Sequence, residues 1–237
     1  MTTKMHSINK TARIAGFLYL LLAPLGFFGG MYIPSLVVPG DAAATGNNIL
    51  NHVWLYRLSI ISALTVPIVN ILLVLQLYKL LKPVNKSNAV LMVVFIVAVA
   101  PIAMFNEISH FAVLLLLNHT DYLKAFSIDQ LYSQVMFFLD LNHYGLFIVS
   151  IFWGLWLFPL GYLIFKSGFL PKAIGILMVI AGFGYVIDSA ILFLLPNLNM
   201  TISQFTFIGE LALLLWLLFK GVNVVQWEKC NLEFTLK

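Results

Sequence analysis

Long apolar stretches separated by short polar turns make up most of the chain. They approach or exceed the roughly 20 residues that a helix needs to cross a bilayer. The stretches predict six transmembrane helices, at Ile14–Ile33, Leu55–Leu81, Ala89–Leu117, Leu131–Phe165, Ala173–Leu195 and Ile202–Phe219. The first is too long for the apolar region of a secretory signal and has no small-residue cleavage site, so we expect it to stay uncleaved. The pattern predicts an all-α integral membrane bundle.

The fourth stretch is longer than a bilayer requires. Its 35 residues would form a helix of about 52 Å, against a hydrocarbon core of roughly 30 Å. We expect either a break near Pro159 and Gly161 or an outer end that projects from the membrane.

The composition agrees with a membrane class. Hydrophobic residues make up 62% of the chain and charged residues only 9%, and the mean hydropathy of +1.00 exceeds that of soluble domains. The only cysteine, Cys230, lies in the polar C-terminal part, so an intramolecular disulfide is excluded. We predict one transmembrane domain over residues 1–222 and a short cytoplasmic tail over 223–237.

The distribution of Lys and Arg predicts the orientation. With the N-terminus inside, eleven of the 13 fall on inner ends and loops, while only Arg57 and Lys124 fall outside. The positive-inside rule then places both termini in the cytoplasm. Because topology accounts for the basic balance, it does not indicate a nucleic-acid partner; the expected partner is the lipid bilayer.

Candidate chemistry lies in acids within the apolar stretches. Glu107 and His110, and likewise Asp140 and His143, repeat an acid-x-x-His pattern. Residues three apart share a helix face, so each acid and its His can point to one place. Two further acids, Asp188 and Glu210, complete the set, and none of the four has a Lys or Arg within helical reach on its own segment.

The predicted topology places these six groups in one layer, about 10 to 18 Å below the outer surface at 1.5 Å per residue. A carboxylate at that depth is costly, and four uncompensated ones would cost on the order of 10 kcal/mol. The acids must therefore be protonated, hydrated in a cavity or neutralised by a cation. Arg57 could offset one of them.

Two divalent metals would balance all four acids, and the six groups could surround one or two such ions. Carboxylates with imidazoles suit Fe, Mn or Zn, and the ligand inventory is similar to that of di-iron carboxylate bundles, although Asp stands for Glu twice here. Such a metal could support hydrolysis or redox chemistry on a lipid-soluble substrate. Whether the protein is an enzyme stays open, and the chain lacks the HExxH and Gly-x-Ser-x-Gly motifs of hydrolases. The predicted metal ligands are Glu107, His110, Asp140, His143, Asp188 and Glu210.

Two other functions fit the same residues. Acids and histidines at one depth can form a proton or cation relay in a small transporter, with helix prolines as kinks. Alternatively, protonated acids can hydrogen-bond with polar neighbours such as Asn106 and Asn142 and fix helix register without catalysis.

Two smaller features concern local geometry. Asp41 follows Pro39-Gly40 and precedes three alanines, which predicts a helix N-cap on the outer side. Gly26 and Gly30 form a GxxxG pattern, which can let two membrane helices approach closely.

Several stretches carry a family resemblance. They are Thr11–Leu20, Val38–Thr45, Leu81–Lys86, Gly182–Ser189 and Gly209–Leu211. With them the chain resembles, over about residues 8 to 222, the bacterial multipass membrane family catalogued as domain of unknown function 4386. The resemblance implies a bacterial cell-membrane protein of about six helices and implies no activity.

Overall fold

The computed structural model describes residues 2–118, 121–195, 198 and 200–236. Among these residues there is no strand, and six helices are long and apolar enough to cross a membrane. The spans are Ile8–Leu36, Val53–Leu81, Lys86–Leu117, Ile128–Ser167, Lys172–Leu194 and Ser203–Lys220. All six predicted helices are confirmed, and the largest difference in their ends is at the start of the first.

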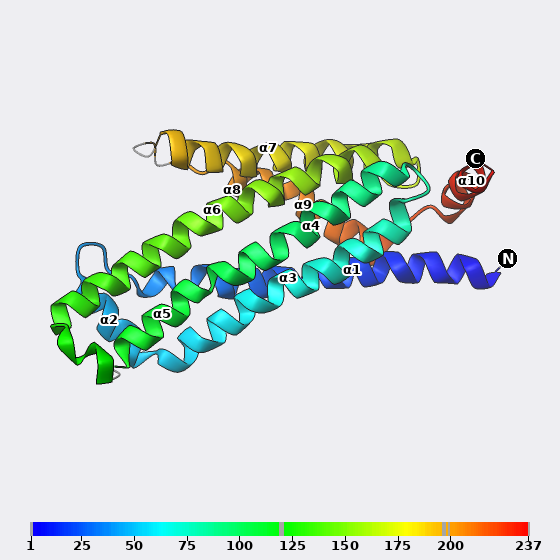
Figure 1. Cartoon of the computed structure of the whole chain (residues 1–237). Helices are drawn as coiled ribbons and strands as arrows, with labels where there is room; N and C mark the ends of the chain where they lie inside the picture. Colours follow the sequence, from blue (N-terminus) through cyan, green and yellow to red (C-terminus); the bar gives the residue numbers. More distant parts are fainter. Residues whose placement is uncertain (1, 119–120, 196–197, 199, 237) are drawn as a thin grey trace. The chain divides into compact units, whose positions relative to one another are not determined.

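Three of the spans consist of more than one helical element (Figure 1), and the first of these contains α1 and the short 3-10 helix η1. The third span is divided at Glu107, and the sixth is divided at Phe207 and ends in one turn of π-helix. In chain order the elements are α1 (Thr2–Met31), η1 (Pro34–Leu36), α2 (Ala42–Asn51), α3 (Val53–Leu81), α4 (Lys86–Asn106), α5 (Ile108–Leu117), η2 (Asp121–Ala125), α6 (Ile128–Ser167), α7 (Lys172–Leu194), α8 (Ser203–Thr206), α9 (Ile208–Leu215), η3 (Trp216–Lys220) and α10 (Val224–Thr235).

The chain folds into two compact units. Unit 1 contains residues 1–21, 69–100 and 147–237, and unit 2 contains residues 22–68 and 101–146. Each unit has its own apolar core and its own buried polar groups, which are described in turn.

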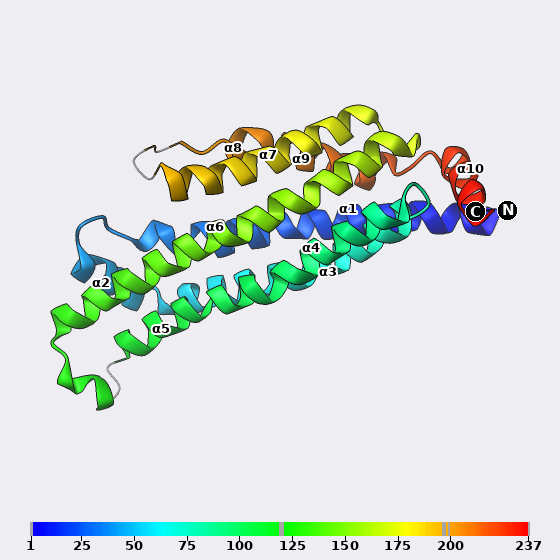
Figure 2. The ribbon, with the colours of Figure 1, turned by 45° about the horizontal axis from the view of Figure 1, so that its top comes forward.

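Close contact between α6 and α7 organises unit 1, where the two helices run side by side and antiparallel (Figures 1 and 2). A Cβ on Gly154 would lie 2.7 Å from the carbonyl oxygen of Gly182, and a Cβ on Gly161 would lie 2.7 Å from that of Gly175. The two glycines are seven residues apart on each helix, so both pairs lie in one antiparallel register. Only hydrogen fits at these positions.

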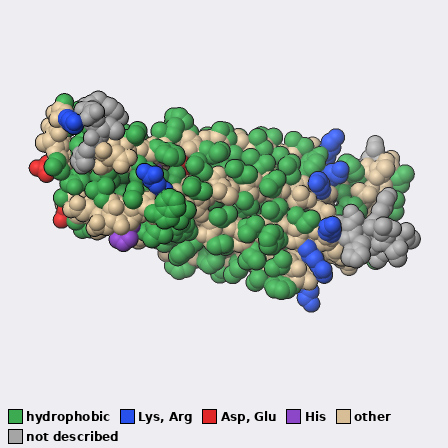
Figure 3. Space-filling model, turned by 90° about the horizontal axis from the view of Figure 1, so that it is seen from below, with side chains coloured by type: hydrophobic (Ala, Val, Ile, Leu, Met, Phe, Trp, Pro, Cys, Tyr) green, Lys and Arg blue, Asp and Glu red, His purple; other side chains and the backbone are tan. Residues whose placement is uncertain are grey.

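Lys and Arg side chains mark one end of unit 1. The turn between α3 and α4 and the turn between α6 and α7 lie at this end, near the start of α1 (Figures 1 and 2). These segments carry Lys82, Lys86, Lys166 and Lys172 among others. Figure 3 shows a group of blue Lys and Arg side chains beside a hydrophobic surface. The arrangement is typical of a helical bundle with one polar membrane boundary.

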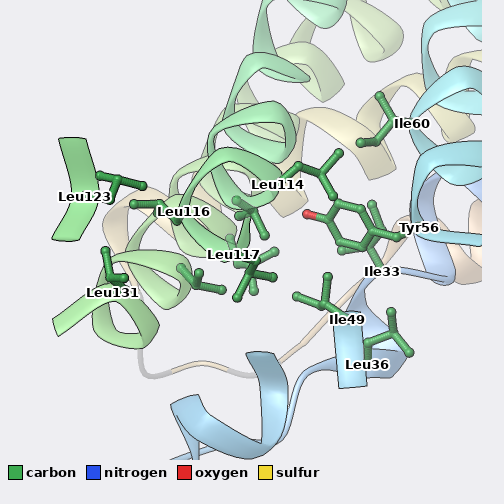
Figure 4. Packing of buried hydrophobic residues seen from close by; sticks show 13 residues of the cluster. Ile33, Leu36, Ile49, Tyr56, Ile60, Leu114, Leu116, Leu117, Leu123 and Leu131 are labelled. Carbon is green, nitrogen blue, oxygen red and sulfur yellow. The ribbon is translucent and has the colours of Figure 1, made fainter. Parts of the chain in front are cut away.

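An apolar cluster fills unit 2, where Tyr56 packs among Ile33, Ile49 and Leu114 (Figure 4). Helix α1 crosses α3 closely, because a Cβ on Gly29 would lie 2.9 Å from the backbone nitrogen of Ala63. Gly26 and Gly30 do not mediate such an approach among the residues that the structure describes, since a Cβ on either would meet nothing within 4 Å.

Two local expectations have clear outcomes. Asp41 caps α2, because its Oδ1 accepts the backbone N–H of Ala44 at 2.8 Å. Of the two alternatives for the fourth stretch, the break near Pro159 and Gly161 is wrong, because α6 continues through both as one helix of 40 residues. A proline inside a bundle removes one backbone donor, and neighbouring groups can satisfy the freed carbonyl without ending the helix.

Candidate functional site

The break between α4 and α5 places Glu107 inside unit 2. Its backbone N–H bonds to Met104 at 3.3 Å, and the turn separates the two helices. The Glu107 side chain is only 8% exposed. Among the described residues, its Oε2 is the only buried side-chain nitrogen or oxygen atom without a hydrogen-bond partner. A buried polar atom without a partner destabilises the folded protein, and a bound ligand or a proton would remove this destabilisation.

One turn further, His110 forms a buried pair with Tyr56 of α3. The Tyr56 hydroxyl lies 3.0 Å from His110 Nδ1, and the two rings meet edge to face with centroids 5.7 Å apart. Tyr56 is fully buried and His110 nearly so. The pair holds the imidazole in a fixed orientation beside the Glu107 turn.

Asn106, at the end of α4, and Asn142 of α6 form a bridge beside the same turn. The Asn106 side-chain amide donates to the carbonyl of Asn142 at 3.0 Å, and the Asn142 amide donates to the carbonyl of Asn106 at 3.1 Å. The Asn142 side chain also lies within interaction distance of Glu107 and His110. Gly145 makes room for this bridge, because a Cβ there would collide with the Asn106 carboxamide.

The other acid-x-x-His pair of unit 2 has a different environment. Asp140 and His143 share one face of α6, as their spacing predicts, but both side chains are exposed. The His143 ring contacts Tyr144 edge to face, with centroids 5.9 Å apart. The two acid-x-x-His motifs therefore differ, because only Glu107 and His110 are buried.

In unit 1, Asp188 caps the short helix α8. Its Oδ1 accepts the backbone N–H of Ile202 at 2.6 Å, and its Oδ2 accepts that of Ser203 at 2.9 Å. Asp188 lies near the end of α7 and is buried. Both oxygens of this acid thus bond to backbone donors at a helix N-terminus, which stabilise its negative charge.

Glu210, also in unit 1, lies in the first turn of α9. Tyr19 of α1 donates to its Oε2 at 2.9 Å, and Tyr185 of α7 donates to its Oε1 at 2.9 Å. Helix α9 approaches α7 closely at Gly209, where a Cβ would lie 2.7 Å from the carbonyl oxygen of Leu177. Three helices thus converge on this carboxyl group.

The six predicted metal ligands therefore fall into both units. Unit 2 brings Glu107 and His110 together, and unit 1 holds Asp188 and Glu210, each with its own hydrogen-bond donors. Within the part of the chain that the structure describes, no group of three or more His, Cys, Asp or Glu side chains is arranged to hold a metal ion. A metal site of all six residues stays a prediction.

Sequence reasoning missed three tyrosines that contact these groups: Tyr19, Tyr56 and Tyr185. Tyr56 lies at the start of its apolar stretch, where tyrosine usually marks the membrane interface, whereas Tyr19 and Tyr185 lie well inside theirs. For Tyr19 and Tyr185, that placement was the available signal. Asn106 and Asn142, by contrast, were among the polar neighbours expected in a hydrogen-bonded network.

The fold and these sites define a multipass helical membrane protein with separate buried polar sites. The model of the family described as domain of unknown function 4386 matches residues 14–221. The chain belongs to this family. A relative described as an uncharacterized protein from Archaeoglobus fulgidus is 34% identical over 163 residues, which cover 69% of this chain and 83% of the relative. No solved structure matches the chain.

Proposed function

We propose that this membrane protein is a proton-coupled cation transporter in which Glu107 binds and releases the coupling proton. One observation carries the proposal: Glu107 Oε2 is buried and has no hydrogen-bond partner among the residues that the structure describes. An ionised carboxylate in that position would be strongly destabilised, whereas a proton or cation would neutralise it.

The helix break around Glu107 supports an ion-handling role. Broken membrane helices expose backbone carbonyls and helix ends, and ion sites of transporters are commonly built from them. Pro101 lies six residues before Glu107 in the same span and removes a further backbone donor. A site with one unused acceptor atom can take up its ligand without first breaking an existing hydrogen bond.

The test is proton flux into liposomes that contain the purified full-length protein and a trapped pH-sensitive dye. An imposed pH gradient should collapse faster than in protein-free liposomes when Na⁺, K⁺ or a quaternary ammonium ion is added outside. The rate should rise with the amount of protein. Decay equal to that of protein-free liposomes with every one of these cations would contradict the proposal.

A second candidate function is metal binding, and the proximity of Glu107 and His110 favours it. Carboxylate and imidazole donors one turn apart suit Fe, Mn or Zn, which could act on a lipid-soluble substrate. Elemental analysis after chelator-free purification should then give about one metal ion per chain, as expected for a transition-metal site. Metal content that is no lower in a Glu107→Gln, His110→Ala variant would argue against this site.

We also propose that both termini face the cytoplasm at the cell membrane, because the inner ends carry most of the Lys and Arg. Cys230 is the only cysteine and lies in α10, outside the spans. Burial and the neighbouring Glu233 raise the pKa of the Cys230 thiol, so less of it is thiolate at neutral pH and labelling should speed up as the pH rises. An impermeant maleimide should label Cys230 in inverted vesicles. Labelling in intact cells instead would mean that the C-terminal helix faces the outside.

A further inference from the structure

Aromatic rings surround the Glu210 carboxyl group of unit 1. Tyr19 and Tyr185 donate their hydroxyls to its two oxygens. Behind them, the Trp156 ring packs on Tyr19 with centroids 6.5 Å apart, and the Trp153 ring meets Tyr185 edge to face at 6.4 Å. We name these five residues, Glu210, Tyr19, Tyr185, Trp153 and Trp156, the aromatic carboxylate cluster.

Four helices position the aromatic carboxylate cluster. Trp153 and Trp156 are three residues apart on α6 and so share one face, while α1, α7 and α9 supply the other members. Gly16 brings α1 close to η3, because a Cβ there would lie 2.7 Å from the backbone nitrogen of Leu218. Tyr19 follows one turn later. The cluster is thus built by packing of several distant segments and is not a local motif.

Charge and chemistry indicate what the cluster can bind. Glu210 brings a carboxyl group into an apolar span whose nearest basic residue along the chain is Lys220, ten positions later and about 15 Å along a helix. An ammonium group would neutralise the carboxylate, and aromatic faces attract such cations strongly when water is excluded. A small, strongly hydrated metal ion would gain little from the rings.

From this combination we propose that the aromatic carboxylate cluster binds a lipophilic organic cation of the ammonium class. The proposal rests on the proposed transport function only for its physiological meaning: the ammonium compound is the substrate exchanged for protons. Binding itself is independent of Glu107. The two proposals can therefore fail separately.

The test is calorimetric titration of the full-length protein in lipid nanodiscs with benzyltrimethylammonium. Saturable binding is expected, and its uncharged carbon analogue neopentylbenzene should not compete. Glu210→Gln should weaken binding on the order of tenfold or more, because it removes the charge and keeps the shape. Trp156→Leu should also weaken binding, and Asp129→Asn, which changes an exposed acid in the first turn of α6, should leave it unchanged.

Three results would exclude the ammonium site at Glu210. No saturable binding to the wild type, equal affinity in Glu210→Gln, or effective competition by neopentylbenzene would overturn the ammonium site. Variants that elute as aggregates are replaced by Tyr185→Phe, which keeps the ring and removes one hydrogen bond to Glu210, and unchanged affinity there overturns the site as well. Ammonium binding without any proton flux would reject the transport function and support the ammonium site. Proton flux with inorganic cations but no ammonium binding would reject the ammonium site and support the transport function.

Discussion

Replacing Glu107 with Gln is expected to lower proton flux to the level of protein-free liposomes. Gln has nearly the same shape and fits the same turn between α4 and α5, but it cannot take up or release a proton. The buried Oε2 that lacks a partner in the wild type becomes one end of a neutral amide. The loss should be essentially complete, because a neutral amide cannot take up or release a proton near neutral pH.

The matched control is Asp129→Asn, the same chemical change at an exposed acid of the same unit. Its flux should stay within about twofold of the wild type, since surface substitutions away from a site usually have small effects. Both variants should unfold within a few degrees of the wild type. Flux that survives in Glu107→Gln, or that is lost equally in both variants, would exclude Glu107 as the proton site.

Replacing Gly175 with Leu is expected to prevent correct packing of α6 against α7. A Cβ at Gly175 would lie 2.7 Å from the carbonyl oxygen of Gly161 and 2.7 Å from the backbone nitrogen of Phe165. These neighbours are backbone atoms, so no rotamer change can relieve the collision, and the helices must separate. We expect a loss of about 3 kcal/mol or more in folding free energy, at the upper end for overpacked cores.

Gly26→Leu is the control for that substitution, because it places the same side chain in a membrane helix where nothing lies within 4 Å. The measurement is the fraction of monodisperse protein that survives heating in detergent. Gly175→Leu should lose most of this fraction at temperatures where Gly26→Leu retains it. Equal survival of the two variants would mean that the α6–α7 glycine contacts do not hold unit 1 together.

The apolar pattern was sufficient to predict the six spans. Backbone polar groups in the hydrocarbon core must be hydrogen-bonded internally, and a long apolar helix meets this condition by itself. The sequence also predicted the N-cap Asp41, since a cap depends on residues within one turn. Where a helix contains a proline, however, local rules do not decide the outcome. The sequence left open either a break near Pro159 and Gly161 or a projecting outer end, and α6 continues through both residues.

The glycines show the same limit. Gly26 and Gly30 had the familiar spacing, but the helix face that carries them meets open space, while Gly154 and Gly161 face the glycines of α7. The spacing of residues in the sequence predicts which of them share a helix face. It does not predict which face another helix covers, because that depends on the rotation of each helix in the bundle.

What the sequence alone determined, therefore, is the membrane class, the number of spans and the presence of four acids that lipid cannot tolerate uncompensated. Only the tertiary structure decided what each acid meets. It buried Glu107 beside His110, left Asp140 and His143 exposed, and gave Asp188 backbone donors and Glu210 two tyrosines. The reason is physical: hydrophobicity is read along one chain segment, whereas a hydrogen-bond partner from a distant segment is selected by packing.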